Sequence, residues 1–186
     1  CDQISDAILD EALKIYPKSR VAIETLVTVN QVIIAGEVTC PKPLDYAEIA
    51  RSVIRDLGYT KEEYRFSHKS DIKVFVHEQS PDIALGVDTG GAGDQGMMFG
   101  YAVDETPELM PLPITLSHRL VRRMDELKVK ELTYLRPDGK SEVSVIYEGG
   151  KPLLVEHVVL AAPHNPQVEK EQVKADLYKL AVLPVL

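Results

Sequence analysis

Cysteine is scarce in this chain of 186 residues, which contains only Cys1 and Cys40. Two cysteines cannot build the disulfide framework that stabilises small secreted domains, so we expect a protein of a reducing compartment, the cytoplasm. The sequence also lacks any apolar run that approaches the roughly 20 residues required by a membrane-spanning helix. These absences exclude a disulfide scaffold and a helical membrane protein.

Positive charge is also in deficit, with 21 Lys and Arg residues against 29 Asp and Glu residues and a formal net charge of −8. A chain of this charge is unsuited to nucleic acid or an anionic membrane as its main partner. A local basic pocket for phosphate groups remains compatible with it. The hydrophobic content of 45% and the charged content of 27% are ordinary for a globular protein with one domain or two small ones.

Helical and strand patterns follow one another along the chain. Apolar residues at helical spacing predict helices over residues 2–16, 44–57, 114–127 and 168–180. Alternating and β-branched stretches predict strands over 20–29, 32–39, 71–78, 96–103 and 151–162, with two more short strands around a turn at Asp138 and Gly139. This order predicts an α+β fold of repeated two-layer units, each a mostly antiparallel sheet covered by helices. We expect a first repeat over residues 1–90 and a second over residues 91–186.

Two carboxylates fall within the hairpin predicted over residues 20–39. If Asn30 and Gln31 form its turn, Glu24 lies directly opposite Glu37, with the two side chains about 5 Å apart on one face. Like charges opposed in this way are destabilising unless a cation, a cationic ligand or a shared proton lies between them. Alternatively, both side chains point to solvent or pair with separate lysines. Spacing alone leaves both interpretations open.

A glycine-rich stretch, GAGDQG at residues 91–96, surrounds Asp94. Glycines allow positive φ and a close approach of the backbone to a ligand, so we interpret this stretch as a binding loop. An ordinary surface connection is the alternative. Arg136 and Lys140 bring positive charge to the predicted Asp138–Gly139 turn, which suits phosphate or a nucleotide, although a tight surface turn would explain the same residues. His68 and His77 lack the spacing of metal ligands and are interpreted as structural.

Five blocks in this order resemble signature blocks of the S-adenosylmethionine synthetase (methionine adenosyltransferase) family: DQISDA (2–7), QSPDI (79–83), GAGDQGMMFGY (91–101), LMPLPI (109–114) and LRPDGK (135–140). The resemblance implies transfer of the adenosyl group of ATP to the sulfur of L-methionine, with release of phosphate and pyrophosphate. It also implies a requirement for Mg²⁺ and K⁺, and a homodimer or dimer of dimers whose active sites are shared between subunits.

The resemblance also assigns roles to individual residues. Glu24 corresponds to a potassium ligand, Glu37 and Gln79 to methionine-binding residues, and Asp94 to a catalytic aspartate, while Asp138 and Lys140 correspond to ATP contacts. A loop that gates the site would include Gln79, Ser80, Pro81, Asp82, Ile83, Gly86 and Asp88.

Several features depart from the family pattern. The family's His-Pro-Asp-Lys block and its third repeat are not found within these 186 residues, so we expect a fragment that is inactive by itself. The gating loop is shorter than usual between Asp88 and Gly91, and Asn30 replaces a common glycine. A non-catalytic, synthetase-like regulatory subunit that binds a full-length partner is the alternative function.

Overall fold

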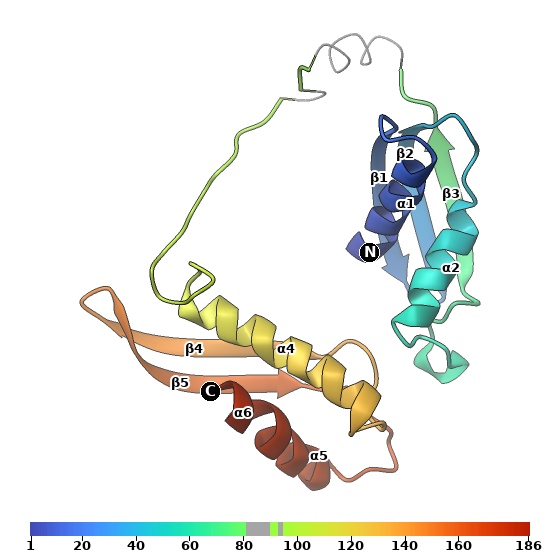
Figure 1. Ribbon diagram of the computed structural model, residues 1–186. Coiled ribbons are helices and arrows are strands. Elements are labelled where there is room, and N and C mark those ends of the chain that lie inside the picture. The colour runs from blue at the N-terminus through green and yellow to red at the C-terminus, as the bar shows by residue number, and fades with distance from the viewer. Residues whose placement is uncertain (81–89, 93–94) are drawn as a thin grey trace. The chain divides into compact units, whose positions relative to one another are not determined.

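The chain folds into two compact units in a computed structural model, unit 1 (Cys1–Met97) and unit 2 (Met98–Leu186) (Figure 1). The structure describes residues 1–80, 90–92 and 95–186. Each unit combines helices with its own small sheet, so the predicted α+β fold is confirmed. Within the described residues, no helix is both long enough and apolar enough to cross a membrane.

Unit 1 is built around a three-stranded sheet. Its elements are α1 (Asp2–Ile15), β1 (Arg20–Thr28), β2 (Gln31–Thr39), α2 (Tyr46–Asp56), a 3-10 turn (Glu62–Tyr64) and β3 (Asp71–His77). The central strand β2 pairs antiparallel with β1 and parallel with β3. The α-helices and strands of this unit agree with the sequence patterns, but the parallel pairing of β3 was not predicted.

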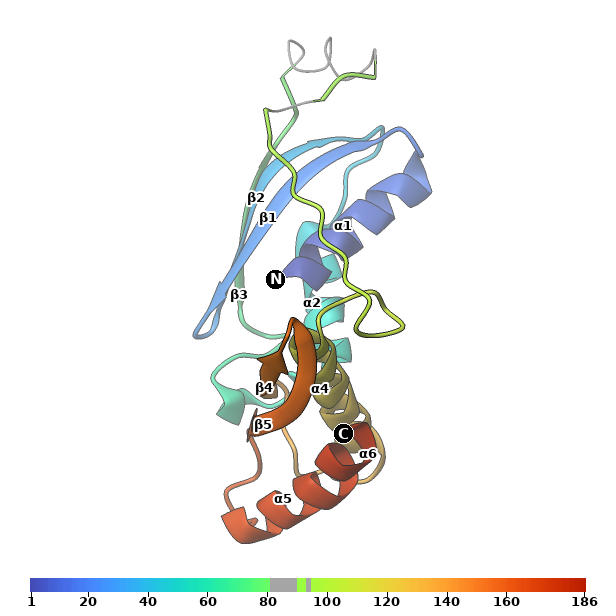
Figure 2. The same ribbon diagram turned by 90° about the vertical axis from the view of Figure 1, so that its left-hand side faces the viewer.

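The two faces of this sheet differ. Both helices lie on the same side of it (Figure 2), where Ile4, Ile8, Ala50 and Ile54 pack against Ile23, Val32, Ile34 and Val38. Side chains alternate between faces along a strand, so the intervening residues point the other way. We call that second surface the open sheet face, because no helix of the described part of unit 1 covers it. Its side chains include Glu24, Leu26, Ile33, Glu37, Lys73, Phe75 and His77.

The register of the β1–β2 hairpin differs from the prediction. Thr28 pairs with Gln31, which leaves Val29 and Asn30 as the loop. Asn30 adopts a φ of 53°, a left-handed conformation that asparagine tolerates better than glutamine. The Asn30 N–H also donates to the carbonyl of Arg65 at 2.9 Å, and its carbonyl accepts from the Asp71 N–H at 3.1 Å. These bonds to the segment leading into β3 hold Asn30 in the loop.

As a result, Glu24 lies opposite Ala35, and Glu37 lies opposite Ala22. The predicted direct opposition of the two carboxylates is therefore wrong. Gly36, next to Glu37, has a φ of 141°, and a Cβ placed on it would lie 2.0 Å from the carbonyl oxygen of Ala22. Only glycine permits this close approach of β1 and β2, so the backbone that presents Glu37 depends on Gly36.

Unit 2 repeats the order of helix, hairpin and helix. It contains α4 (Leu112–Lys130), β4 (Lys140–Glu148), β5 (Lys151–Ala161) and α5 (Lys170–Leu177), which continues through a π-helical turn (Tyr178–Val182) into α6 (Leu183–Val185). The strands β4 and β5 pair antiparallel. In the core, Leu116 and Leu120 of α4 cluster with Val143 of β4. A second cluster joins Met124 and Leu127 of α4 to Val173, Leu177 and Ala181.

The hairpin turn of unit 2 lies at Gly149 and Gly150, whose φ angles of 58° and 79° suit a two-residue loop between twisted strands. The predicted hairpin at Asp138 and Gly139 is wrong. In its place, Leu135 forms an isolated antiparallel bridge with His164. A Cβ on Gly139 would lie 3.1 Å from the Cε of Met124, so this loop packs against α4 rather than turning back at the surface.

Two further features after residue 95 differ from the prediction. Residues 96–103 form no strand in the structure as described, and the side chains of Met97, Met98 and Phe99 are exposed. Helix α4 begins at Leu112, slightly earlier than predicted, because Pro113 lies in the first turn, where the missing N–H is not needed. The Glu105 carboxylate accepts a hydrogen bond from the Leu112 N–H at 2.9 Å at this end of the helix.

Candidate active site

The open sheet face brings Glu24 and Glu37 onto one surface. Since Glu24 faces Ala35, Glu37 is its diagonal neighbour across the hairpin, at a separation of roughly 7–8 Å. Neither carboxylate has a hydrogen-bond or ion-pair partner among the described residues. Two unpaired carboxylates at this separation suit a cationic group or a cation better than a shared proton, which would require direct contact.

His77 lies beside this pair, because β3 runs parallel to β2 and its residue 77 pairs with Glu37. No pattern in the sequence places His77 there, since its lone position lacks a ligand motif. Recognising it would have required knowledge that β3 adds to β2 in parallel.

Gln79 follows β3 by two residues and is anchored to the start of β1. The Arg20 Nε donates a hydrogen bond of 2.6 Å to the Gln79 Oε1. Because β1 begins where β2 and β3 end, Arg20, Gln79 and Glu37 lie at the same end of the sheet. Arg20 was not recognised from the sequence. Its pairing with Gln79 joins residues 59 positions apart, and no local pattern signals it.

A cavity of about 280 Å³ lies at this end of the sheet. Its lining includes Cys40, Tyr46, His77 and Glu78. Burial raises the pKa of the Tyr46 hydroxyl, and the nearby Cys40 thiol adds to the increase. The phenol therefore remains protonated and available as a hydrogen-bond donor at neutral pH.

Six other predicted site residues are not among those that the structure describes. Asp94, Pro81, Asp82, Ile83, Gly86 and Asp88 lie outside the described residues. Of the predicted gating loop, the structure describes Gln79 and Ser80.

The two predicted ATP contacts lie in unit 2. The Lys140 Nζ lies 3.6 Å from the Asp138 Oδ2, and both side chains are exposed. Asp138 has a φ of 75°, and the N–H of the nearby Arg136 donates to the Pro163 carbonyl at 2.7 Å. The loop is thus held by backbone contacts while its charged groups face outward.

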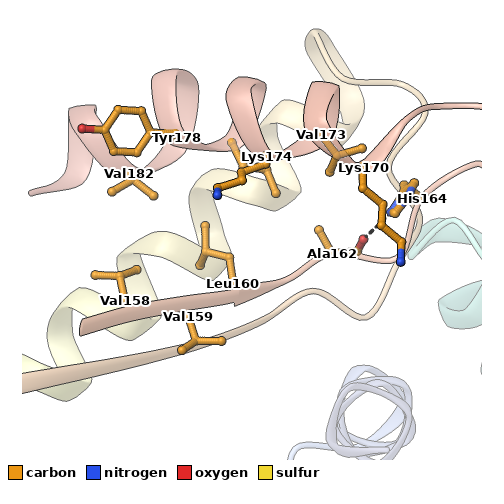
Figure 3. Close-up of a pocket in the computed structure, with 11 residues that line it drawn as sticks. Val158, Val159, Leu160, Ala162, His164, Lys170, Val173, Lys174, Tyr178 and Val182 are labelled. Carbon is orange, nitrogen blue, oxygen red and sulfur yellow. Dashed lines mark hydrogen bonds between the residues drawn. The ribbon is translucent and has the colours of Figure 1, made fainter.

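Unit 2 also contains an apolar cavity of about 540 Å³ between β5 and the helical segment formed by α5, the π-helical turn and α6. Figure 3 shows Val158 and Leu160 pointing from β5 toward the helical segment, which contributes Val173 and Val182. None of the predicted site residues that the structure describes lines this cavity.

The carboxylate oxygens on the open sheet face are the type of ligand that a hard cation binds, but there are too few of them to complete its coordination. Carboxylate oxygens are among the oxygen ligands that Mg²⁺ prefers. Within the described part of the chain, however, no group of three or more His, Cys, Asp or Glu side chains is placed to hold a metal. Glu24 and Glu37 can therefore supply only part of a coordination shell.

Comparison with known proteins gives consistent matches for both units. The family model described as "S-adenosylmethionine synthetase, N-terminal domain" matches residues 1–81, and the one described as "S-adenosylmethionine synthetase, central domain" matches residues 89–186. The S-adenosylmethionine synthase of Thermus thermophilus is 50% identical over 97% of this chain and 50% of its own length. That of Desulforudis audaxviator is 47% identical over the whole chain and 51% of its own length.

The chain spans about half the length of these curated relatives. The two family models together cover nearly all of it, in the order in which their names place the domains. The chain therefore belongs to the S-adenosylmethionine synthetase family.

Proposed function

We propose that the full-length protein containing this chain synthesises S-adenosylmethionine from ATP, L-methionine and water, releasing phosphate and pyrophosphate. The observation that carries the proposal is the identity of 47–50% with named synthases over 97–100% of the chain. Gln79, Asp138 and Lys140 also lie within two of the blocks that resemble family signatures, QSPDI and LRPDGK.

The open sheet face would hold the positively charged parts of the reaction. Glu37 would bind the ammonium group of methionine, together with Gln79 at the same end of the sheet. Glu24 would be a ligand of K⁺. Carboxylates near the substrate also favour the sulfonium that develops as the sulfur is alkylated, because they stabilise charge where it forms.

In the transfer step, a sulfur lone pair attacks a ribose carbon of ATP. The new S–C bond forms as the C–O bond to the triphosphate breaks, and the triphosphate leaves with the bonding electrons. Water then cleaves the triphosphate to pyrophosphate and phosphate. No proton has to move in the first step, so positioning and electrostatics supply most of the catalysis.

The remaining predicted residues would act on the nucleotide and on access to the site. Asp94 is proposed to be catalytic, and Asp138 and Lys140 to contact ATP. Residues of the stretch that begins at Gln79 and Ser80 would gate the site. Bound Mg²⁺ would offset the charge of the triphosphate, but the described residues provide no complete set of ligands for it.

The proposal extends to architecture and assembly. We propose repeats over residues 1–90 and 91–186, and a third repeat in the part of the full-length protein that this chain does not span. The protein would be cytoplasmic, as expected for a chain with two free cysteines. A homodimer, or a dimer of dimers, is supported by the open sheet face, where Leu26 is 54% and Phe75 is 55% exposed.

The alternative is a non-catalytic regulatory subunit of the same family. An upstream His-Pro-Asp-Lys block would favour the enzyme, because the family carries a catalytic histidine and a magnesium aspartate there. Its absence from the full-length protein would favour the regulatory subunit.

The deciding experiment measures S-adenosylmethionine formation by the purified full-length protein with ATP, L-methionine, Mg²⁺ and K⁺. If the protein is the enzyme, the assay yields one equivalent each of S-adenosylmethionine, phosphate and pyrophosphate. If the protein is a regulatory subunit, it forms no product alone but changes the rate of S-adenosylmethionine formation when it is added to an active synthetase. The 186-residue piece by itself is expected to form no product.

A further inference from the structure

Thr39, the last residue of the central strand β2, has a buried hydroxyl group without a partner. Its Oγ1 is shielded from solvent and forms no hydrogen bond with the residues that the structure describes. A hydroxyl in this state has given up its hydrogen bonds to water and received none in return, which destabilises the fold. Native structures retain few such groups, and a role in function is one physical reason to retain one.

This hydroxyl lies at the end of the sheet that carries the proposed methionine site. Thr39 pairs with Arg20 of β1, so both side chains lie on the open sheet face. In the parallel register of β2 and β3, Glu37 pairs with His77, and the same register places Gln79 level with Thr39. Because β2 is the central strand, the hydrogen bond from the Arg20 Nε to the Gln79 Oε1 spans the end of β2 at which Thr39 lies.

Hydrogen-bond donors and an acceptor therefore form two neighbouring rows on the open sheet face. The Thr39 hydroxyl and the Gln79 NH₂ group form one row, and both can donate. The Glu37 carboxylate lies in the next row along β2, and when ionised it only accepts. Residues i and i+2 on one face of a strand are roughly 7 Å apart. A small zwitterion therefore fits between the rows, with a hydrogen bond of about 2.8 Å at each end.

We propose that Thr39 is a further methionine-binding residue, whose hydroxyl donates a hydrogen bond to the α-carboxylate of the substrate. The ammonium group of the same zwitterion binds Glu37, and the Gln79 NH₂ group shares the carboxylate with Thr39. The buried hydroxyl is then satisfied only when the substrate is bound. This inference rests on the proposed function and specifies which part of the substrate this end of the sheet recognises, the charged head group of an α-amino acid.

Removing the hydroxyl should separate substrate binding from stability. Thr39→Val keeps the shape of the side chain and breaks no hydrogen bond among the described residues, so without substrate it should unfold at the same denaturant concentration as the wild type, or at a higher one. In the full-length protein it should raise the KM for methionine about tenfold and change the KM for ATP less than about twofold.

Two matched variants serve as controls. Thr39→Ser keeps a hydroxyl at the same position and should retain a KM for methionine close to that of the wild type. Thr28→Val removes an exposed hydroxyl at the opposite end of the same hairpin and should change neither KM. An increase in the KM for methionine in Thr28→Val equal to that in Thr39→Val would overturn the inference.

A competitor that lacks the carboxylate identifies the contact. The probe is 3-(methylthio)propylamine, which has the ammonium and thioether groups of methionine but no carboxylate. Its inhibition constant should be the same in the wild type and in Thr39→Val. An increase as large as that of the KM for methionine would mean that Thr39 contacts another part of the substrate, which would overturn the inference.

The remaining outcomes distinguish this inference from the proposed function on which it rests. A full-length wild-type protein that forms no S-adenosylmethionine would overturn both. An active wild type whose KM for methionine is unchanged by Thr39→Val would overturn the inference alone. A lower denaturation midpoint of Thr39→Val without substrate would also overturn it, because the hydroxyl would then have a partner in the protein itself.

Discussion

The Arg20 Nε donates a hydrogen bond of 2.6 Å to the Oε1 of Gln79, which joins the first residue of β1 to the segment that follows β3. Because its carbonyl oxygen accepts this bond, the Gln79 amide is oriented, and its NH₂ group has no acceptor among the residues that the structure describes. A substrate carboxylate is an acceptor that such a group can bind. Arg20 is thus proposed to position Gln79 rather than to contact methionine itself.

If the full-length protein has the proposed activity, we expect Arg20→Ala to raise its KM for methionine about tenfold, with a smaller effect on kcat. The variant leaves the Gln79 amide free to rotate, which weakens ground-state binding. Initial rates over a range of methionine concentrations give both constants. Arg55→Ala, which removes an exposed ion pair with Glu48, is the control and should change neither. Equal changes in the KM for methionine in Arg20→Ala and Arg55→Ala would show that Arg20 has no positioning role.

Glu37 and Glu24 should respond differently to the same isosteric change. Glu37→Gln removes the charge proposed to bind the methionine ammonium group and should raise the KM for methionine about tenfold or more. Glu24→Gln should instead weaken activation by K⁺ and leave the KM for methionine nearly unchanged at saturating K⁺. Titrations of methionine and of K⁺ distinguish the two effects. A reversed pattern would mean that the two roles are exchanged.

Gly36→Ala should destabilise unit 1 strongly. The new Cβ would lie 2.0 Å from the Ala22 carbonyl, and a φ of 141° is itself strained for alanine. We expect a loss of about 3 kcal/mol in the free energy of unfolding, measured by denaturant titration. Gly150→Ala is the comparison, since a Cβ there meets nothing within 4 Å and only its φ of 79° is strained. A smaller loss for Gly36→Ala than for Gly150→Ala would refute the close approach.

The stability of unit 2 should depend on pH through Asp176. Its carboxylate accepts from the Gln172 Nε2 at 2.9 Å and from the Tyr134 hydroxyl at 2.6 Å. The Gln172 bond and then the Tyr134 bond lower the pKa of Asp176. A carboxyl whose pKa is lower in the folded state stabilises the fold above its unfolded pKa of about 3.9, and this contribution is lost as the pH falls through the folded value.

Asp176→Asn should therefore lower the denaturation midpoint at pH 7 more than at pH 3. Tyr134→Phe, made in the otherwise wild-type protein, removes one hydrogen-bond donor to the same carboxylate. It should therefore reduce the difference in stability between pH 7 and pH 3. Denaturant titrations of the full-length protein at both pH values measure it. If Asp176→Asn lowers the denaturation midpoint equally at pH 7 and pH 3, the proposed pH-dependent contribution of Asp176 is contradicted.

The sequence allowed the faces of the β1–β2 hairpin to be predicted, but not its register. The predicted and observed registers differ by two residues, and a shift of two keeps every side chain on its own face. The pattern of buried residues therefore fits both registers, and Glu24 and Glu37 share a face of the sheet in either one. The loop conformation of Asn30 decided between them, and it depends on bonds to Arg65 and Asp71 far along the chain.

The hairpin turn of unit 2 was predicted at the wrong residues for a related reason. Asp138–Gly139 and Gly149–Gly150 are both good turn sequences, but only the second joins the paired strands β4 and β5. The first is held by contacts of its neighbours with Pro163 and His164, which local pattern cannot reveal. The long-range placement of Arg20 and His77 was missed for the same reason, whereas the motif residues themselves were recognisable from the sequence.

The position of bound methionine tests the central claim most directly. A crystal structure of the full-length protein with L-methionine and a non-hydrolysable ATP analogue should place the substrate ammonium group about 3 Å from the Glu37 carboxylate, with the Gln79 amide also in contact. Methionine bound to other residues, with Glu37 and Gln79 facing solvent, would contradict the proposed site.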